Sequence, residues 1–271
     1  MGEEQRAIRA IPPSMAPILE ELEMEQPGLV TSEDLAKIAQ RHGVRSHPRA
    51  IAARLRDLGW LLPTPRRGVW EFAPAALAGA YSRNDALTPL KAFLSKRSGA
   101  RCALTFQAAA WAHGVADRLP TRPEVAAADR QLAYQLPEQL APSVFLPNLA
   151  SQQLREVPVL APESVVTHMA TRPAAVRSWS STIEWLPELA ELLDAGRLRI
   201  ELTGRPAAVR ARTGYLLQQL RPDLATMIRD LGLPTSTTWF GPRETLRRHD
   251  STWLMADTIL PFDPRDLRQA V

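Results

Sequence analysis

The 271-residue sequence contains one cysteine, Cys102, no apolar run long enough to cross a membrane, and no apolar segment near its start. A single cysteine excludes an internal disulfide and favours a reducing, intracellular compartment. The opening residues, MGEEQRAIRA, are charged and do not resemble a secretory signal peptide. From these absences we expect a soluble, cytoplasmic protein that makes no use of a membrane.

The common motifs of catalytic sites are also missing. The sequence has no GxxxxGK(S/T), GxGxxG, HExxH, GxSxG or paired CxxC motif, and its five histidines show no metal-ligand spacing. A metal-dependent nuclease would need clustered acids together with a lysine, but the last lysine, Lys96, lies far before the nearest acidic pair, Asp194 and Glu201. We therefore expect no enzymatic activity, no metal and no cofactor.

Positive charge is concentrated between Lys37 and Trp70. This stretch has eight basic residues and one acidic residue, Asp57, a net charge of +7, whereas the whole chain carries only +4. Residues 1–73 are neutral in total, because glutamates in the first predicted helix balance the later arginines. Such a module has an acidic rear and a basic front, which favours a polyanionic partner, most simply double-stranded DNA.

The same region has the outline of a winged helix-turn-helix. Apolar spacing predicts a helix over 14–24, a second helix that begins at Thr31 or Ser32, and a third that is capped by Ser46 and ends at Gly59. Gly43 is expected to form the turn between the second and third helices. Residues 60–62 and 69–72 are two strand-like runs joined by a basic Pro/Gly turn. We assign residues 1–74 to this DNA-binding domain.

The third helix is the predicted reading helix. Ile51, Leu55 and Leu58 form its buried stripe, which sets Arg54 nearer the buried side. Small residues between arginines allow a helix to lie deep in the major groove while guanidinium groups reach base edges or phosphates. The predicted DNA contacts, from the turn, the helix and the tip of the wing, are Arg45, Ser46, His47, Arg49, Ala53, Arg56, Arg66 and Arg67.

Residues 75–271 are predicted to form a larger mixed α/β domain, so that the chain as a whole is an α+β protein with two domains. Strands are expected near 101–105, 123–128, 143–146, 154–160, 237–240 and 251–254, and Pro187 is expected to interrupt a helix over 179–193. His113 is expected to be a packed or capping residue. The basic stretch 197–221 is either a solvated face or a second phosphate-contacting surface, with Arg205, Arg210 and Arg212 as its candidate contacts.

Four motifs in this order resemble the AbiEi family of antitoxin regulators from type IV toxin–antitoxin systems. They are RRGVWEFAP at 66–74; Leu104-Thr105, Ala108-Ala109 and His113-Gly114, followed by Pro120 and Val125; Arg205-Pro206 with TGYLL at 213–217; and Trp253 with DTILP at 257–261. The chain departs from the family pattern at Phe106-Gln107, where a serine is more usual.

The resemblance implies an autorepressor that binds inverted repeats in its own promoter through the N-terminal domain. It also implies that the C-terminal domain neutralises a nucleotidyltransferase-like toxin, with no direct contact assumed. Inverted repeats suit a dimer or two monomers side by side. Two alternatives stay open: a winged-helix regulator whose C-terminal domain senses a small molecule, and a nuclease fused to a DNA-binding head.

Overall fold

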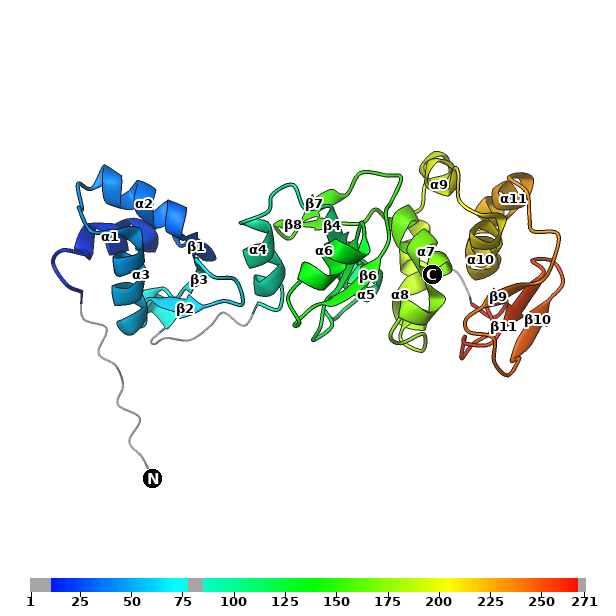
Figure 1. Ribbon diagram of the computed structural model, residues 1–271. Coiled ribbons are helices and arrows are strands. Elements are labelled where there is room, and N and C mark those ends of the chain that lie inside the picture. Colours follow the sequence, from blue (N-terminus) through cyan, green and yellow to red (C-terminus); the bar gives the residue numbers. More distant parts are fainter. Residues whose placement is uncertain (1–10, 78–84, 268–271) are drawn as a thin grey trace, which may run out of the picture. The chain divides into compact units, whose positions relative to one another are not determined.

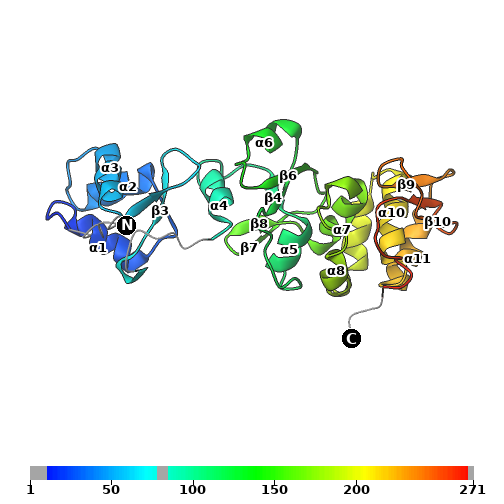
Figure 2. The ribbon, with the colours of Figure 1, turned by 90° about the horizontal axis from the view of Figure 1, so that it is seen from below.

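The computed structural model describes residues 11–77 and 85–267, and it divides the chain into two compact units, Met1–Ala100 and Arg101–Val271. The described residues contain eleven α-helices, two short 3-10 helices and three sheets (Figures 1 and 2). None of these helices is both long and apolar enough to cross a membrane.

The first unit combines four helices with a small antiparallel sheet. Its elements are α1 (Ala16–Glu25), β1 (Leu29–Thr31), α2 (Ser32–Arg41), α3 (Pro48–Asp57), β2 (Leu61–Pro63), β3 (Val69–Phe72), the 3-10 helix η1 (Ala75–Leu77) and α4 (Thr88–Leu94). The strand order is β1-β3-β2, with Val30 opposite Trp70 and Leu62 opposite Glu71. The sequence predicted α1, α2, α3, β2 and β3 but missed β1, whose three residues form the third strand.

Local sequence explains where α2 and α3 begin. Thr31 caps α2 in a capping box: its Oγ1 accepts from the backbone N–H of Asp34, and the Asp34 carboxylate accepts from the backbone N–H of Thr31. The prediction that Ser46 caps α3 is wrong. The cap is His47, whose Nδ1 accepts from the backbone N–H of Arg49 at 3.2 Å.

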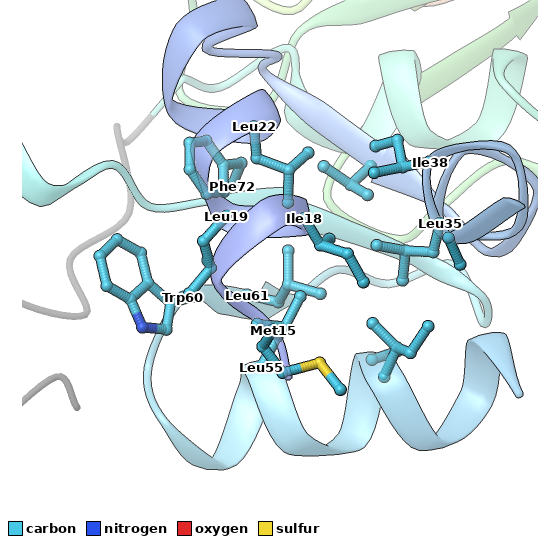
Figure 3. Packing of buried hydrophobic residues seen from close by; sticks show 14 residues of the cluster. Met15, Ile18, Leu19, Leu22, Leu35, Ile38, Leu55, Trp60, Leu61 and Phe72 are labelled. Carbon is cyan, nitrogen blue, oxygen red and sulfur yellow. The ribbon is translucent and has the colours of Figure 1, made fainter. Parts of the chain in front are cut away.

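The helices of the first unit enclose one apolar core. Ile18, Leu19 and Leu22 from α1 meet Leu35 and Ile38 from α2, together with residues of α3 and the sheet (Figure 3). Gly43, at φ 66°, turns the chain between α2 and α3 in a conformation that glycine adopts without strain. The first unit continues beyond the predicted 1–74 domain, because α4 packs against β1 and β3.

A five-stranded mixed sheet begins the second unit, in the order β6-β5-β4-β8-β7. Its central pair, β4 and β5, is antiparallel, whereas β8 runs parallel to β4 and β6 parallel to β5. Its elements are β4 (Cys102–Leu104), α5 (Phe106–Ala112), β5 (Glu124–Ala127), α6 (Arg130–Gln135), β6 (Ala141–Val144), β7 (Gln152–Leu154) and β8 (Val157–Val159).

Helices α7 to α11 lie between this sheet and a second, three-stranded sheet of order β10-β11-β9 (Figures 1 and 2). These elements are α7 (Pro162–Thr171), the 3-10 helix η2 (Pro173–Ala175), α8 (Thr182–Glu191), α9 (Ala195–Leu202), α10 (Ala207–Leu217), α11 (Pro222–Asp230), β9 (Thr238–Phe240), β10 (Arg248–Asp250) and β11 (Met255–Asp257).

Two expectations for the second unit are wrong. Helix α8 runs through Pro187 without a break. This proline is the sixth residue of α8, so an internal hydrogen bond of the helix is lost there, and burial of Trp185, Leu186 and Leu189 offsets that loss. The strand expected over 251–254 is a turn between β10 and β11, closed by a bond from the backbone N–H of Trp253 to the Asp250 carboxylate at 3.0 Å.

Candidate nucleic-acid interface

Helix α3 presents one apolar face to the core and one basic face to solvent. Ile51, Ala52 and Leu55 are buried, whereas Arg49, Ala53 and Arg56 are exposed. Ser46 and His47, in the turn before the helix, are exposed as well. The small side chain of Ala53 leaves the exposed surface between the two arginines free of bulk, as a helix that enters a DNA groove requires.

The arginines of this face are free of acidic partners. Within residues 11–77 and 85–267, the side chains of Arg45, Arg49, Arg54 and Arg56 form no ion pair, and all four are exposed. Arg54 is therefore as accessible as its neighbours, although the helical wheel placed it nearer the buried side. Unpaired guanidinium groups keep their charge and their donors available for phosphate oxygens or guanine edges.

Acidic residues in the same unit pair with other bases. Glu21 of α1 contacts both Arg41 and His42, and Glu33 contacts Lys37 across one turn of α2. The acidic residues of α1 and α2 thus neutralise the basic side chains nearest to them and leave the arginines of α3 unpaired.

His47 both caps α3 and offers a second ring nitrogen to solvent. Since Nδ1 accepts a hydrogen bond, the proton of the neutral ring is on Nε2. The exposed Nε2–H group is a donor at the N-terminus of α3, the end through which helix-turn-helix proteins approach base edges. Burial does not restrict this donor.

The turn between β2 and β3 is held by side-chain hydrogen bonds. The Thr64 hydroxyl donates to the carbonyl of Val69 at 2.8 Å and accepts from the backbone N–H of Arg66 at 3.2 Å. Gly68, at φ 78°, accepts from the backbone N–H of Ser32 at 3.1 Å, which ties the turn to the start of α2. The tip of the wing is therefore a defined structure attached to the helical part.

The two arginines at this tip differ in their surroundings. Arg67 is exposed, whereas Arg66 is half-buried, with its guanidinium carbon 5.9 Å from the centre of the Phe93 ring of α4. The side chain of Arg97 lies over the same ring at 5.6 Å. Arg66 thus takes part in a cation–π contact within the first unit, and Arg67 is the freer of the two for contact with a phosphate.

The candidate phosphate contacts in the second unit all donate to protein groups. The Arg205 guanidinium pairs with buried Glu201 at 2.5 Å and lies 4.7 Å from the Phe145 ring centre. Arg210 donates to the carbonyls of Arg205 and Gly232, at 2.7 and 3.0 Å. Arg212 donates to the carbonyls of Trp239 and Ala170, at 2.8 and 3.3 Å. These contacts fix the fold of the second unit.

The sequence motifs that lie far apart meet inside the second unit. A Cβ atom added to Gly214 would lie 2.1 Å from ring atoms of Trp253, so α10 packs its glycine directly on that indole. One residue on, the Tyr215 hydroxyl donates to the Asp257 carboxylate at 3.2 Å, and Arg248 donates to the same oxygen at 2.9 Å. Burial, and secondarily the charge of Asp257, raise the pKa of Tyr215, which stays a neutral donor.

A buried histidine that the sequence did not single out lies at the centre of the second unit. His168 of α7 is fully buried; its Nδ1 is 2.8 Å from the Thr105 hydroxyl and its Nε2 is 3.0 Å from the Ser143 hydroxyl. Its ring stacks on Phe145, with centroids 4.3 Å apart. Burial, reinforced by the nearby charges of Arg172 and Arg205, holds the pKa of His168 well below its usual range.

Glu124 is a second buried titratable group in this unit. Its carboxylate accepts from the backbone N–H of Ala108 at 3.1 Å, and burial raises its pKa to about 7. It lies beside Phe106, which adopts a φ of 49° at the start of α5, a conformation that a bulky residue rarely takes. His113, expected to be a packed or capping residue, lies 2.8 Å from the carbonyl of Leu160 through its Nε2.

No group of three or more histidine, cysteine, aspartate or glutamate side chains within the described part of the chain is arranged to hold a metal ion. The positions of the buried carboxylates and histidine that are described above follow from packing and hydrogen bonds to protein groups. The main polar features of the described residues are thus the exposed arginines of the first unit and the buried, hydrogen-bonded polar residues of the second.

Comparisons with known proteins agree with this division. No curated protein matches the chain. Among solved structures, the chain is similar to the RV2827C protein from Mycobacterium tuberculosis, with 25% sequence identity, a TM-score of 0.78 and 95% of each chain covered. Residues 100–219 match the family model described as the AbiEi antitoxin C-terminal domain. The resemblance inferred from the sequence motifs is thereby confirmed for residues 100–219, the region that this antitoxin family model matches.

Proposed function

We propose that the protein is an autorepressing antitoxin of a type IV toxin–antitoxin system, whose first unit is a winged helix-turn-helix that binds promoter DNA. The observation that carries the proposal is the unpaired, exposed set of arginines on α3, next to a basic wing. A cluster of uncompensated positive charge on a helix with a small-residue face is suited to a DNA groove. The element order α1-β1-α2-α3-β2-β3 supports the same assignment.

In this proposal the contacts divide into two kinds. Arg49 and Arg56, on the exposed face of α3, reach base edges or the phosphates that flank the major groove, and Arg45, Ser46 and His47 approach from its N-terminal end. Arg67 at the wing tip contacts a phosphate, and Arg66 contributes less because it is stacked on Phe93. Binding to inverted repeats would be by a dimer or by two monomers side by side.

The antitoxic activity belongs to the second unit in this proposal, because that unit contains the matched antitoxin domain. Its functional partner is a nucleotidyltransferase-like toxin, and no direct contact between the two proteins is assumed. The protein itself performs no catalysis in this account; plasmid cleavage in the presence of Mg²⁺ or Mn²⁺ would contradict that part of the proposal.

A gel-shift titration on the promoter of its own operon tests DNA binding by the full-length protein. The double variant Arg49→Ala/Arg56→Ala removes two charges from α3, and the matched control Arg199→Ala/Arg229→Ala removes two exposed charges from the second unit. We expect the first variant to lose affinity and the control to retain it. Equal affinities for the wild type and the α3 variant would contradict the proposal.

A further inference from the structure

A cavity of about 530 Å³ lies in the second unit, at the C-terminal end of α7. Its walls come from segments distant in the sequence: the start of α6, strand β6, the turn from α7 into η2, helix α10 and the loop after β9. Its charged lining residues are Arg130, Arg172 and Arg212, and no acidic side chain is among the described residues that line it. A concave site with three cations and no carboxylate is suited to an anion.

Arg212 is the most enclosed of the three arginines. Its Nε and Nη1 donate to the carbonyls of Trp239 and Ala170, which leaves other N–H groups of the planar fork without a partner among the described residues. No carboxylate pairs with it in the described part of the chain, and burial lowers its pKa. A partly desolvated cation without a counter-charge is costly, and an anion in the cavity would offset that cost.

Arg130 and Arg172 complete the charged wall. Arg130 is the first residue of α6 and Arg172 follows the last residue of α7; both are exposed, and neither forms an ion pair within residues 11–77 and 85–267. A purely structural role is the competing explanation, because basic side chains at the end of α7 also complement its helix dipole. That role requires neither a cavity nor a contribution from α6.

Ser143 brings a hydroxyl group to the same cavity. Its oxygen is 3.0 Å from Nε2 of His168, and Nδ1 of that ring is 2.8 Å from the Thr105 hydroxyl. When Thr105 donates to Nδ1, the neutral ring carries its proton on Nε2 and donates to Ser143. The Ser143 hydroxyl is then left with its own proton to donate into the cavity. The buried relay thus orients a neutral donor beside the arginines.

We propose that this cavity binds a small phosphorylated ligand through its phosphate group, held by Arg130, Arg172, Arg212 and the Ser143 hydroxyl. A planar guanidinium group can donate two parallel hydrogen bonds to two phosphate oxygens, and the Ser143 hydroxyl would add a further donor. The volume falls in the range of small-molecule sites and exceeds what one phosphate needs. Val144, Pro173 and Pro242 form an apolar wall for the remainder of a phosphomonoester. The proposal is independent of DNA binding by the first unit.

Isothermal titration calorimetry on the full-length protein tests it with three probes: inorganic phosphate, adenosine 5′-monophosphate and unphosphorylated adenosine. We expect heat from at least one of the two phosphate-bearing probes and none from adenosine. Arg130→Ala/Arg172→Ala should weaken binding about tenfold or more, since each removes charge-assisted hydrogen bonds. Ser143→Ala should weaken it less. The control Arg199→Ala/Arg229→Ala, which removes equal charge elsewhere, should bind like the wild type.

Several results would overturn the proposal. They are no heat from either phosphate-bearing probe, binding of adenosine equal to that of its monophosphate, or phosphate binding that Arg130→Ala/Arg172→Ala leaves unchanged. If Arg130→Ala/Arg172→Ala melts at a lower temperature but binds phosphate as before, the two arginines serve to cap the helix. If the wild type binds no phosphate and this variant loses affinity for promoter DNA, the two arginines contact the DNA backbone instead. Loss of DNA binding by α3 variants would leave this proposal standing.

Discussion

The arginines of α3 in the first unit and two arginines of the second unit, Arg205 and Arg248, are used in opposite ways. On α3 of the first unit, Arg49 and Arg56 are exposed and, within the described residues, unpaired. In the second unit, Arg205 and Arg248 are fixed to the buried carboxylates of Glu201 and Asp257. Arg49, Arg56 and Arg205 all lie in stretches that are basic in the sequence. The comparison teaches that a count of charges locates an interface only when the acids that pair with those charges are also known.

Replacement of a fixed arginine should have the largest effect of all. Arg205→Ala would leave the Glu201 carboxylate, which is fully buried, without its cation, and we expect a loss of about 3–5 kcal/mol in the free energy of unfolding. Denaturant titration would measure it. Arg199→Ala, which replaces an exposed arginine of α9, should change stability by less than about 0.5 kcal/mol. Equal stabilities for the two variants would break the contrast between the units.

The buried carboxyl of Glu124 extends the comparison to pH. Its pKa is raised from 4.5 to about 7 in the folded protein, so the folded state binds the proton more tightly than the unfolded state does. Stability should therefore fall as pH rises from about 4.5 to 7, by roughly 1.4 kcal/mol per pH unit, and then level off.

Glu124→Gln keeps the shape of the side chain and removes the titration. Thermal melting from pH 4.5 to 8 should show the decline in the wild type and a flatter profile in the variant. The exposed neighbour Glu138 provides the control, because Glu138→Gln should leave the profile unchanged. Parallel profiles for wild type and Glu124→Gln would show that this carboxyl does not titrate in the window.

The contact between α10 and Trp253 offers a smaller structural test. Gly214→Ala places a methyl group in the indole ring, and overpacking of this kind costs about 1–3 kcal/mol. Gly99, where an added Cβ meets nothing within 4 Å, supplies the control Gly99→Ala. Chemical denaturation would compare the two. A Gly214→Ala protein as stable as the control would contradict the close approach of these two motifs.

At the wing, the comparison sharpens to two adjacent residues. Arg67 is exposed and Arg66 is stacked over Phe93, so Arg67→Ala should flatten the salt dependence of DNA binding by about one unit of slope, and Arg66→Ala by less. Gel shifts at a series of salt concentrations would give the slopes. A larger change for Arg66→Ala would reverse the roles of the two residues.

Patterns of short range in the sequence were enough to predict much of the first unit. The stripe of Ile51 and Leu55, the caps around Thr31 and the turn at Gly43 are all local, and the structure agrees with them. Strand β1 was missed because three residues carry no recognisable alternation, and only pairing with β3 makes them a strand. Helix continuity through Pro187 depends on burial of its neighbours, which is also not local.

The polar network of the second unit could not be predicted for the same reason. His168 has no telling neighbours in the sequence, yet it joins Thr105, 63 residues before it, to Ser143. The arginines of 197–221 could have been a solvated or a phosphate-contacting surface. In the structure, carbonyl groups that Arg205 and Arg212 contact come from α7, β9 and the loop before β7. The order of the motifs along the chain was enough to identify the antitoxin domain, although the contacts of its individual residues could not be predicted.

The account depends most on the claim that the exposed arginines of α3 bind promoter DNA. The most direct measurement is the affinity of the full-length Arg49→Ala/Arg56→Ala protein for that promoter, next to the Arg199→Ala/Arg229→Ala control. For each of the two arginines that contacts a base, we predict that the first variant loses about 1–3 kcal/mol of binding free energy. Its melting temperature should not change, and the control should bind the promoter like the wild type. Wild-type affinity in the α3 variant, or an equal loss in both, would contradict the account.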